Sequence, residues 1–321
     1  MSCFEPLTAY QIIYADYTSE IRFTRPKTGK FKELKVPCGK CIGCKLDKAN
    51  DWSIRCWCEM QQWKNNCFIT LTYNDNHIPQ NGYLDKRDIQ LFMKKLRYYH
   101  TGIEEWTNPI NGKKEKPIRF MLCGEYGPNG TRRPHYHLLI FNWKPDKLKF
   151  HKENQWGDRI MTSKDIEDIW GKGFITVGEL TYKSACYVAR YTTKKMFNET
   201  KVKDLKKAEI QPEFILMSRM PGIGYKYWNN YKNEILNREG ILIKLKDKVK
   251  NKKIPKYFER KYKEQIGDKK WLKYSDKKQK KAKKTMQEIL KNTSMSESEY
   301  QQMLKRKLLE SAKLLKRNNF C

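Results

Sequence analysis

Two histidines separated by one residue stand in the segment His135-Tyr136-His137. The apolar run LLIF that follows at residues 138–141 predicts a β-strand. Because alternate residues of a strand point to the same face, both imidazoles should project together and Tyr136 should point the opposite way. Two imidazoles on one face suit a divalent ion when a third ligand arrives from elsewhere, and Glu125 is the candidate. An ordinary polar strand face is the alternative interpretation.

Two tyrosines, Tyr187 and Tyr191, lie four residues apart in a segment that predicts a helix, so both phenols should share one face. A phenol that has lost its proton can attack a phosphodiester, and the aryl phosphate formed keeps the energy of the broken bond. Lys194 and Lys195, on the next turn, could stabilise phosphate charge or lower the pKa of a phenol. We expect Tyr182 to precede the helix. The alternative is an amphipathic helix whose tyrosines pack in the core.

Three cysteines, Cys38, Cys41 and Cys44, are spaced three residues apart, and Cys56 or Cys58 is available as a fourth ligand. Paired Cys-x-x-Cys spacing predicts a structural, tetrahedral Zn²⁺ site. The three-cysteine run is also compatible with an iron–sulfur cluster, and buried thiols without a metal are the third interpretation. The first ten residues lack a basic and then apolar signal peptide, which favours reduced, intracellular cysteines.

The elements that must position these residues alternate in type along the chain. Strands are predicted at residues 67–73, 118–126, 135–143 and 174–180, and helices at 85–99, 164–170 and 184–195. Asp85 is expected to cap the first of these helices. The order β-α-β-β-α-β-α predicts an α+β fold, with an antiparallel central sheet flanked by helices in a ferredoxin-like arrangement.

Composition predicts three segments: a Cys-rich N-terminal region at residues 1–66, the α+β domain at 67–240 and a basic, largely helical tail at 241–321. The tail holds 26 Lys or Arg against 9 Asp or Glu. Ser296 and Glu299 form a capping-box pattern ahead of an amphipathic helix in the tail.

The formal net charge of +31 predicts a polyanionic partner. No apolar run approaches the roughly 20 residues that span a bilayer, so nucleic acid is a better candidate than a membrane. Basic residues interleaved with aromatic ones suit a groove that follows a single strand by charge and stacking, although most of these aromatics are expected in the core. The aromatic residues concerned are Trp52, Trp57, Trp63, Tyr98, Tyr99 and Trp143.

Taken in order, these segments resemble the HUH endonuclease superfamily, and they are most similar to the replication initiators of gokushovirus-like Microviridae. The first motif is FITLTY at residues 68–73, and the second is Glu125 followed by RPHYHL at 133–138. The third is YVARY at residues 187–191, followed by Lys194 and Lys195. The CxxCxxC segment, Asp51-Trp52 with Arg55, and MSRMPGIG at 217–224 also resemble this branch. The three ordered motifs cover residues 67–197.

The resemblance implies a rolling-circle replication initiator that nicks and rejoins single-stranded origin DNA. His135, His137 and Glu125 would hold Mg²⁺ or Mn²⁺, although the donor set also suits Zn²⁺. Tyr187 or Tyr191 would attack the phosphate, leaving a free 3′-hydroxyl and a 5′-phosphotyrosine, and the second tyrosine would serve circle closure.

The expected location is the cytoplasm of an infected bacterial host. The sequence has no GxxxxGK[ST] run, so a host helicase and a host polymerase are implied as partners. The alternatives are a non-catalytic, zinc-containing nucleic-acid-binding protein and a DNA-packaging protein. Oligomeric state and origin sequence stay open.

Overall fold

The protein is described here by a computed structural model that covers residues 3–80, 82–127, 133–155, 157–197, 210–245 and 248–317, without the side chains of 191–197 and 311–317. The chain divides into two compact units, one formed by Met1–Lys48 together with Pro255–Cys321 and the other by Ala49–Ile254. These limits differ from the segment boundaries predicted at residues 66 and 240, because the two ends of the chain pack together in one unit.

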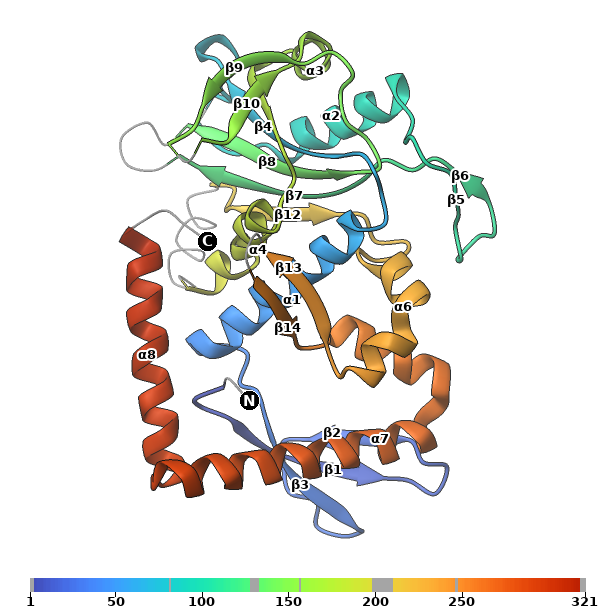
Figure 1. Ribbon diagram of the computed structural model, residues 1–321, viewed down its shortest axis with the longest axis vertical. Helices are drawn as coiled ribbons and strands as arrows, with labels where there is room; N and C mark the ends of the chain where they lie inside the picture. The colour runs from blue at the N-terminus through green and yellow to red at the C-terminus, as the bar shows by residue number, and fades with distance from the viewer. Residues whose placement is uncertain are drawn as a thin grey trace. The chain divides into compact units, whose positions relative to one another are not determined.

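The larger unit is built on a seven-stranded antiparallel sheet, seen nearly edge-on in Figure 1. The four strands predicted from sequence form its centre in the order β7-β8-β4-β11. Their bounds are Arg119–Tyr126 for β7, Pro134–Phe141 for β8, Asn66–Tyr73 for β4 and Gly173–Gly178 for β11. Three strands that the sequence did not predict extend the edges: β12 (Phe214–Met217), β10 (Arg159–Thr162) and β9 (Lys149–Glu153).

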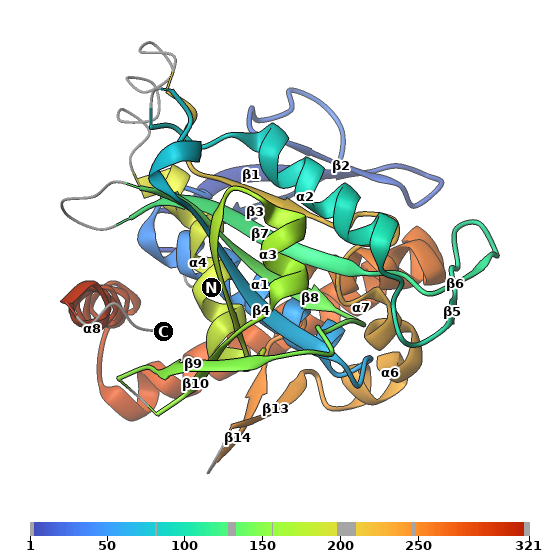
Figure 2. The same cartoon turned by 90° about the horizontal axis from the view of Figure 1, so that it is seen from above.

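Helices cover both faces of this sheet (Figure 2). On one face, α2 (Lys86–Tyr99) and α3 (Lys164–Trp170) enclose a core that contains Ile69, Leu71, Leu138 and Ile140. On the other face, α4 (Tyr182–Phe197) packs against β7, β8 and β12. Burial on both faces explains the nearly continuous apolar runs of β7 and β8.

The predicted helices of this unit are confirmed with small shifts in their limits. Asp85 is the N-cap of α2, and its side chain accepts a hydrogen bond of 2.6 Å from the Arg87 backbone N–H. The expectation for Tyr182 was wrong, because this residue begins α4 and does not precede it.

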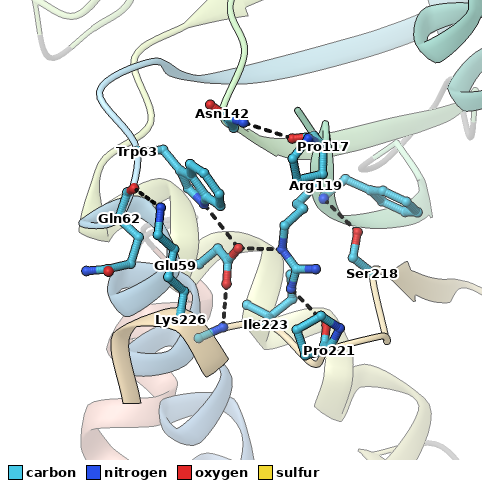
Figure 3. A network of polar contacts seen from close by, with 12 residues as sticks. Glu59, Gln62, Trp63, Pro117, Arg119, Asn142, Ser218, Pro221, Ile223 and Lys226 are labelled. Atoms are coloured by element: carbon cyan, nitrogen blue, oxygen red, sulfur yellow. Dashed lines mark hydrogen bonds and ion pairs between the residues drawn. The ribbon is translucent and has the colours of Figure 1, made fainter. Parts of the chain in front are cut away.

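A buried polar network in the larger unit holds the segment at residues 217–224 (Figure 3). Glu59 Oε1 lies 2.6 Å from Arg119 Nε, and both side chains are almost fully buried. The Gly224 backbone N–H donates to the second oxygen of Glu59, and Arg119 donates to the Pro221 carbonyl. Arg55 donates to the Ile223 carbonyl at 3.0 Å. Two segments singled out in the sequence, around residue 55 and at 217–224, therefore meet in space.

The larger unit has further elements outside this sheet and its covering helices. They are η1 (Asp75–His77), the paired strands β5 (Trp106–Thr107) and β6 (Lys114–Glu115), α6 (Tyr225–Asn237), and the hairpin of β13 (Ile241–Leu245) and β14 (Lys248–Lys252). The hairpin occupies the start of the segment that was predicted to be a largely helical tail.

The smaller unit contains a three-stranded sheet in the order β2-β1-β3 and two long helices. The strands are β1 (Leu7–Ile13), β2 (Ser19–Arg22) and β3 (Phe31–Val36), and the helices are α7 (Lys256–Thr293) and α8 (Glu297–Arg317). Lys32 pairs with Asp276 of α7 at 3.1 Å. The capping box is confirmed: Ser296 and Glu299 exchange hydrogen bonds at the start of α8. Helix α1 (Ile42–Met60) runs from the smaller unit into the larger one.

Candidate metal and nucleophile site

The site is built on the central strand pair β7–β8. His135 and His137 lie on the face of β8 that α4 covers, while Tyr136 is fully buried on the opposite face and its hydroxyl donates to the Asp85 carbonyl. The predicted division of the three side chains between the two faces is confirmed. In the register of the two strands, Glu125 stands directly opposite His135. Cross-strand neighbours of this kind have close Cβ atoms, so a carboxylate and two imidazoles converge.

One carboxylate oxygen is the centre of this group. Glu125 Oε1 lies 2.8 Å from His135 Nε2 and 2.7 Å from His137 Nε2. The ligand atoms of the three residues all lie within 4.8 Å of one another. Glu125 is only 4% exposed and His137 is 9% exposed, so the group is shielded from solvent. Burying a carboxylate is costly unless it is paired with hydrogen-bond donors or cations.

The donor set fits a divalent metal ion. Each imidazole turns Nε2 toward Glu125 and uses Nδ1 for an outer contact: His135 Nδ1 lies 3.0 Å from the Arg133 carbonyl, and His137 Nδ1 lies 3.0 Å from Thr70 Oγ1. Outer contacts of this type orient metal-binding histidines in proteins. Phe68, from the neighbouring strand β4, stacks on the His137 ring at a centroid distance of 5.6 Å. The three side chains could therefore hold a metal ion.

Tyr187 completes the site from α4. Its hydroxyl donates to Glu125 Oε1 at 2.7 Å and lies 3.3 Å from His137 Nε2. Burial and the Glu125 carboxylate raise the pKa of Tyr187 far above its usual value, and the Arg190 guanidinium, 5.5 Å from the ring centroid, opposes that rise. Val188 and Ala185 anchor this part of α4 because both are fully buried against the sheet. The helix thus brings one of the two predicted nucleophiles to the predicted ligands.

The side chains of Tyr191, Lys194 and Lys195 lie outside the described residues, although their backbone belongs to α4. Their predicted roles stay predictions.

A second group of possible ligands lies in the smaller unit. Cys3, Cys38, Cys41 and Cys44 place their sulfur atoms within 4.8 Å of one another. Cys56, predicted as the fourth member, is instead fully buried in the core of the larger unit, with its sulfur 3.2 Å from Met121 Sδ. The structure therefore groups Cys3, and not Cys56, with Cys38, Cys41 and Cys44, and metal binding by these cysteines stays a prediction.

Three residues of these two groups were missed by sequence reasoning. Thr70 and Phe68 belong to a strand that was predicted, and the period of two places both on the face of the histidines. Their role depends on the pairing of β4 with β8, which no local pattern reveals. Cys3 stands 35 residues before Cys38, too far for any spacing rule.

The fold and the site together define a mixed α+β protein in which two histidines, a glutamate and a tyrosine meet on one face of a large antiparallel sheet. Residues 66–196 match the model of a family described as the replication-associated protein ORF2 family. This range contains all four site residues.

Curated relatives match most of the chain. It is 35% identical over 299 residues to the replication-associated protein ORF2 of Spiroplasma virus 4, covering 89% of this chain and 88% of that protein. It is 33% identical over 278 residues to the replication-associated protein VP4 of Bdellovibrio phage phiMH2K, covering 86% of this chain and 82% of the relative. The replication-associated protein ORF4 of Chlamydia phage 1 is 29% identical over 213 residues, which cover 65% of this chain and 49% of the relative.

The chain belongs to the phage replication-associated proteins, and the resemblance drawn from its motifs is confirmed. No solved structure matches it significantly. Among the described residues, no helix is both long and apolar enough to span a membrane.

Proposed function

We propose that this protein is a rolling-circle replication initiator that nicks and rejoins single-stranded origin DNA through a 5′-phosphotyrosine. The observation that carries the proposal is the contact of the Tyr187 hydroxyl with Glu125 Oε1 at 2.7 Å, because the same oxygen contacts both histidines. A nucleophile and a set of metal ligands in one site are what phosphodiester transfer requires.

The sheet supports a ferredoxin-like HUH core. Across the sheet, the four central strands lie in the order β7-β8-β4-β11. In the chain these are the second, third, first and fourth of the four, and each neighbouring pair is antiparallel. Helices α2 and α3 cover one face, as in a split βαβ arrangement. The nucleophile helix α4 covers the other face, where the histidines lie.

His135, His137 and Glu125 would hold Mg²⁺ or Mn²⁺. When bound, the cation would polarise the scissile phosphate and offset the negative charge that a phenolate brings beside Glu125. The outer contacts from Thr70 and Arg133 keep both Nε2 atoms directed at this position.

The chemical step then follows from the position of Tyr187. Its hydroxyl loses a proton, and the phenolate oxygen attacks the phosphorus atom and forms the Tyr–O–P bond. The bond from phosphorus to O3′ breaks, and O3′ takes up a proton and becomes the free 3′-hydroxyl that can prime synthesis. The 5′-phosphate stays on the tyrosine, so the bond energy is conserved for rejoining.

Tyr191, one helical turn further on, would serve as the second nucleophile, with Lys194 and Lys195 beside the phosphate. A second cut at the regenerated origin would release a 3′-hydroxyl that attacks the first phosphotyrosine and closes a circle. Single-stranded DNA is the expected direct partner, and a host helicase and polymerase would supply unwinding and synthesis.

The proposal is tested with a labelled, single-stranded origin oligonucleotide. Covalent protein–DNA product should form with Mn²⁺ or Mg²⁺ and be absent with EDTA. We expect Tyr187→Phe and Tyr191→Phe each to impair circle closure while at least one of them still nicks, and the double variant to form no covalent product. Tyr182→Phe is the matched control, because this phenol lies on the first turn of the same helix.

Covalent attachment in the double variant would falsify the assignment of the nucleophiles. A shift of the oligonucleotide without cleavage under any metal condition would instead favour the non-catalytic, zinc-containing nucleic-acid-binding protein.

A further inference from the structure

We propose that Cys3, Cys38, Cys41 and Cys44 bind a single tetrahedral Zn²⁺ ion, which joins the N-terminal end of the chain to the start of α1. The inference concerns the smaller unit and does not depend on the nicking reaction. The proposed fourth ligand is Cys3, where the sequence had suggested Cys56. The proposal also chooses zinc over the iron–sulfur cluster and the metal-free thiols that the cysteine spacing left open.

The sheet of the smaller unit explains why Cys3 meets the other three cysteines. Strands β1 and β3 are antiparallel neighbours, and Leu7 pairs with Val36 at the end of the ladder. Cys3 lies shortly before this pair in the chain and Cys38 shortly after it, so both stand at the same end of the sheet. The chain then turns at Gly39, whose φ of +75° suits glycine, and Cys44 follows in the first turn of α1.

The distances between the sulfur atoms favour one ion. All four lie within 4.8 Å of one another, and those of Cys3 and Cys41 are 3.9 Å apart. Thiolates at about 2.3 Å from a tetrahedral zinc are separated by about 3.8 Å. An iron–sulfur cluster places several iron atoms and sulfides between its thiolates and holds them further apart. A disulfide would need sulfur atoms at about 2.05 Å.

Backbone N–H groups already point at two of the sulfur atoms. The Cys38 N–H donates to Cys3 Sγ at 3.3 Å, and the Cys41 N–H donates to Cys38 Sγ at 3.3 Å. Outer hydrogen bonds of this kind orient metal-binding side chains in proteins. Cys3 precedes the three-stranded segment in the chain and Cys38 follows it, so a metal bound by both would close that segment into a loop.

The smaller unit has a small hydrophobic core, so a metal link would add substantially to its stability. Among its described side chains, the buried apolar ones are those of Cys3, Ala9, Pro255 and Phe258. So few buried groups supply little hydrophobic stabilisation, and small domains with this deficit usually rely on metals or disulfides. A metal that binds only the folded state adds its binding free energy to the stability of the fold.

The test measures bound metal in the full chain, purified under reducing conditions from cells supplied with zinc. We expect one zinc per chain by mass spectrometry, and after replacement by Co²⁺ the absorption spectrum of a tetrahedral tetrathiolate. Cys3→Ser should weaken zinc retention against a competing chelator by at least about tenfold. Any Co²⁺ that this variant still binds should show the spectrum of a site with fewer thiolates.

Cys56→Ala is the matched control, and it should keep one zinc and the full tetrathiolate spectrum. The proposal fails if Cys3→Ser keeps the wild-type affinity and spectrum, or if the Cys56 variant loses the metal. Iron with inorganic sulfide would overturn it in favour of a cluster. Zinc-free protein with fewer than ten titratable thiols in denaturant would overturn it in favour of disulfides.

Discussion

Glu125 is the residue on which the geometry of the site depends. Its Oε1 contacts His135 Nε2, His137 Nε2 and the Tyr187 hydroxyl, all at 2.7–2.8 Å. A carboxylate that is 4% exposed needs polar partners of this kind, and the Tyr187 hydroxyl donates a hydrogen bond to it. The same crowding means that small rotations of either imidazole would misplace the ligands. The groups that fix the rings are therefore as important as the rings themselves.

Thr70 fixes one of these rings, because its hydroxyl lies 3.0 Å from His137 Nδ1. We predict that Thr70→Val raises the Mn²⁺ concentration needed for half-maximal nicking by about 10- to 100-fold, as loss of an outer contact usually does. The maximal amount of covalent product at saturating Mn²⁺ should fall less. The measurement is product formed against metal concentration.

Thr72→Val is the control for this substitution. Thr72 lies on the same face of β4, opposite His135, whose Nδ1 contacts the Arg133 carbonyl instead. Equal shifts in the two variants would show that the strand, and not the hydroxyl of Thr70, is responsible.

At the scale of secondary-structure elements, the site depends on the correct pairing of β4 with its neighbouring strands. β4 carries Phe68 and Thr70 to the histidines, and its other edge pairs with β11 from Gly173 to Gly178. Gly173 has a φ of +145°, and a Cβ there would collide with the backbone of Asn74, Thr72 and Tyr73. The start of β11 can approach β4 this closely only because residue 173 has no side chain.

We predict that Gly173→Ala lowers the free energy of unfolding of the larger unit by more than about 3 kcal/mol, since backbone strain and a backbone clash combine. Denaturant unfolding followed by tryptophan fluorescence measures the change. Gly178→Ala, at the other end of the same strand, meets nothing within 4 Å and should change stability by less than about 1 kcal/mol. Similar losses in both variants would contradict the clash argument.

Charge is the property of the whole molecule that most constrains its partners. The net charge is +31, and helix α7 contributes 14 basic against 5 acidic residues. Residues 277–284 of α7 contain six lysines and no acidic residue. Like charges three or four residues apart weaken a helix by themselves. A phosphate backbone would relieve this repulsion, which makes α7 the element best suited to contact DNA without regard to sequence.

We predict that replacing Lys277, Lys283 and Lys284 by Gln together reduces the salt dependence of single-stranded DNA binding. Three phosphate contacts correspond to a change of about 2 in the slope of log affinity against log salt. The slope is measured by fluorescence anisotropy with a non-origin oligonucleotide. The control removes three charges elsewhere, at Lys113 and Lys114 of the β5–β6 hairpin and at Lys116, directly after it. If the slope of log affinity against log salt falls equally in both triple variants, the effect is due to net charge and not to α7.

Much of the site could be predicted from the sequence because its signals are local. The alternation of a strand placed His135 and His137 on one face, and the capping signal at Asp85 located a helix to within a residue. Strand β9 escaped prediction because its sequence is largely polar and its residues are exposed, and β10 because it has only four residues, two of them polar. In the sheet, β10 pairs with β11 and β9 pairs with β10. β12 is short and pairs with β7 from a distant part of the chain.

By itself, the sequence determined which residues share a face of a strand or helix, since periodicities of two and 3.6 follow from backbone geometry alone. Only the tertiary structure decided that Glu125 Oε1 meets both imidazoles and Tyr187, that Thr70 contacts His137, and that Cys3 lies beside Cys38, Cys41 and Cys44. Those contacts depend on the register between strands that are far apart in the chain. Register is set by the packing of the whole core, which no local pattern encodes.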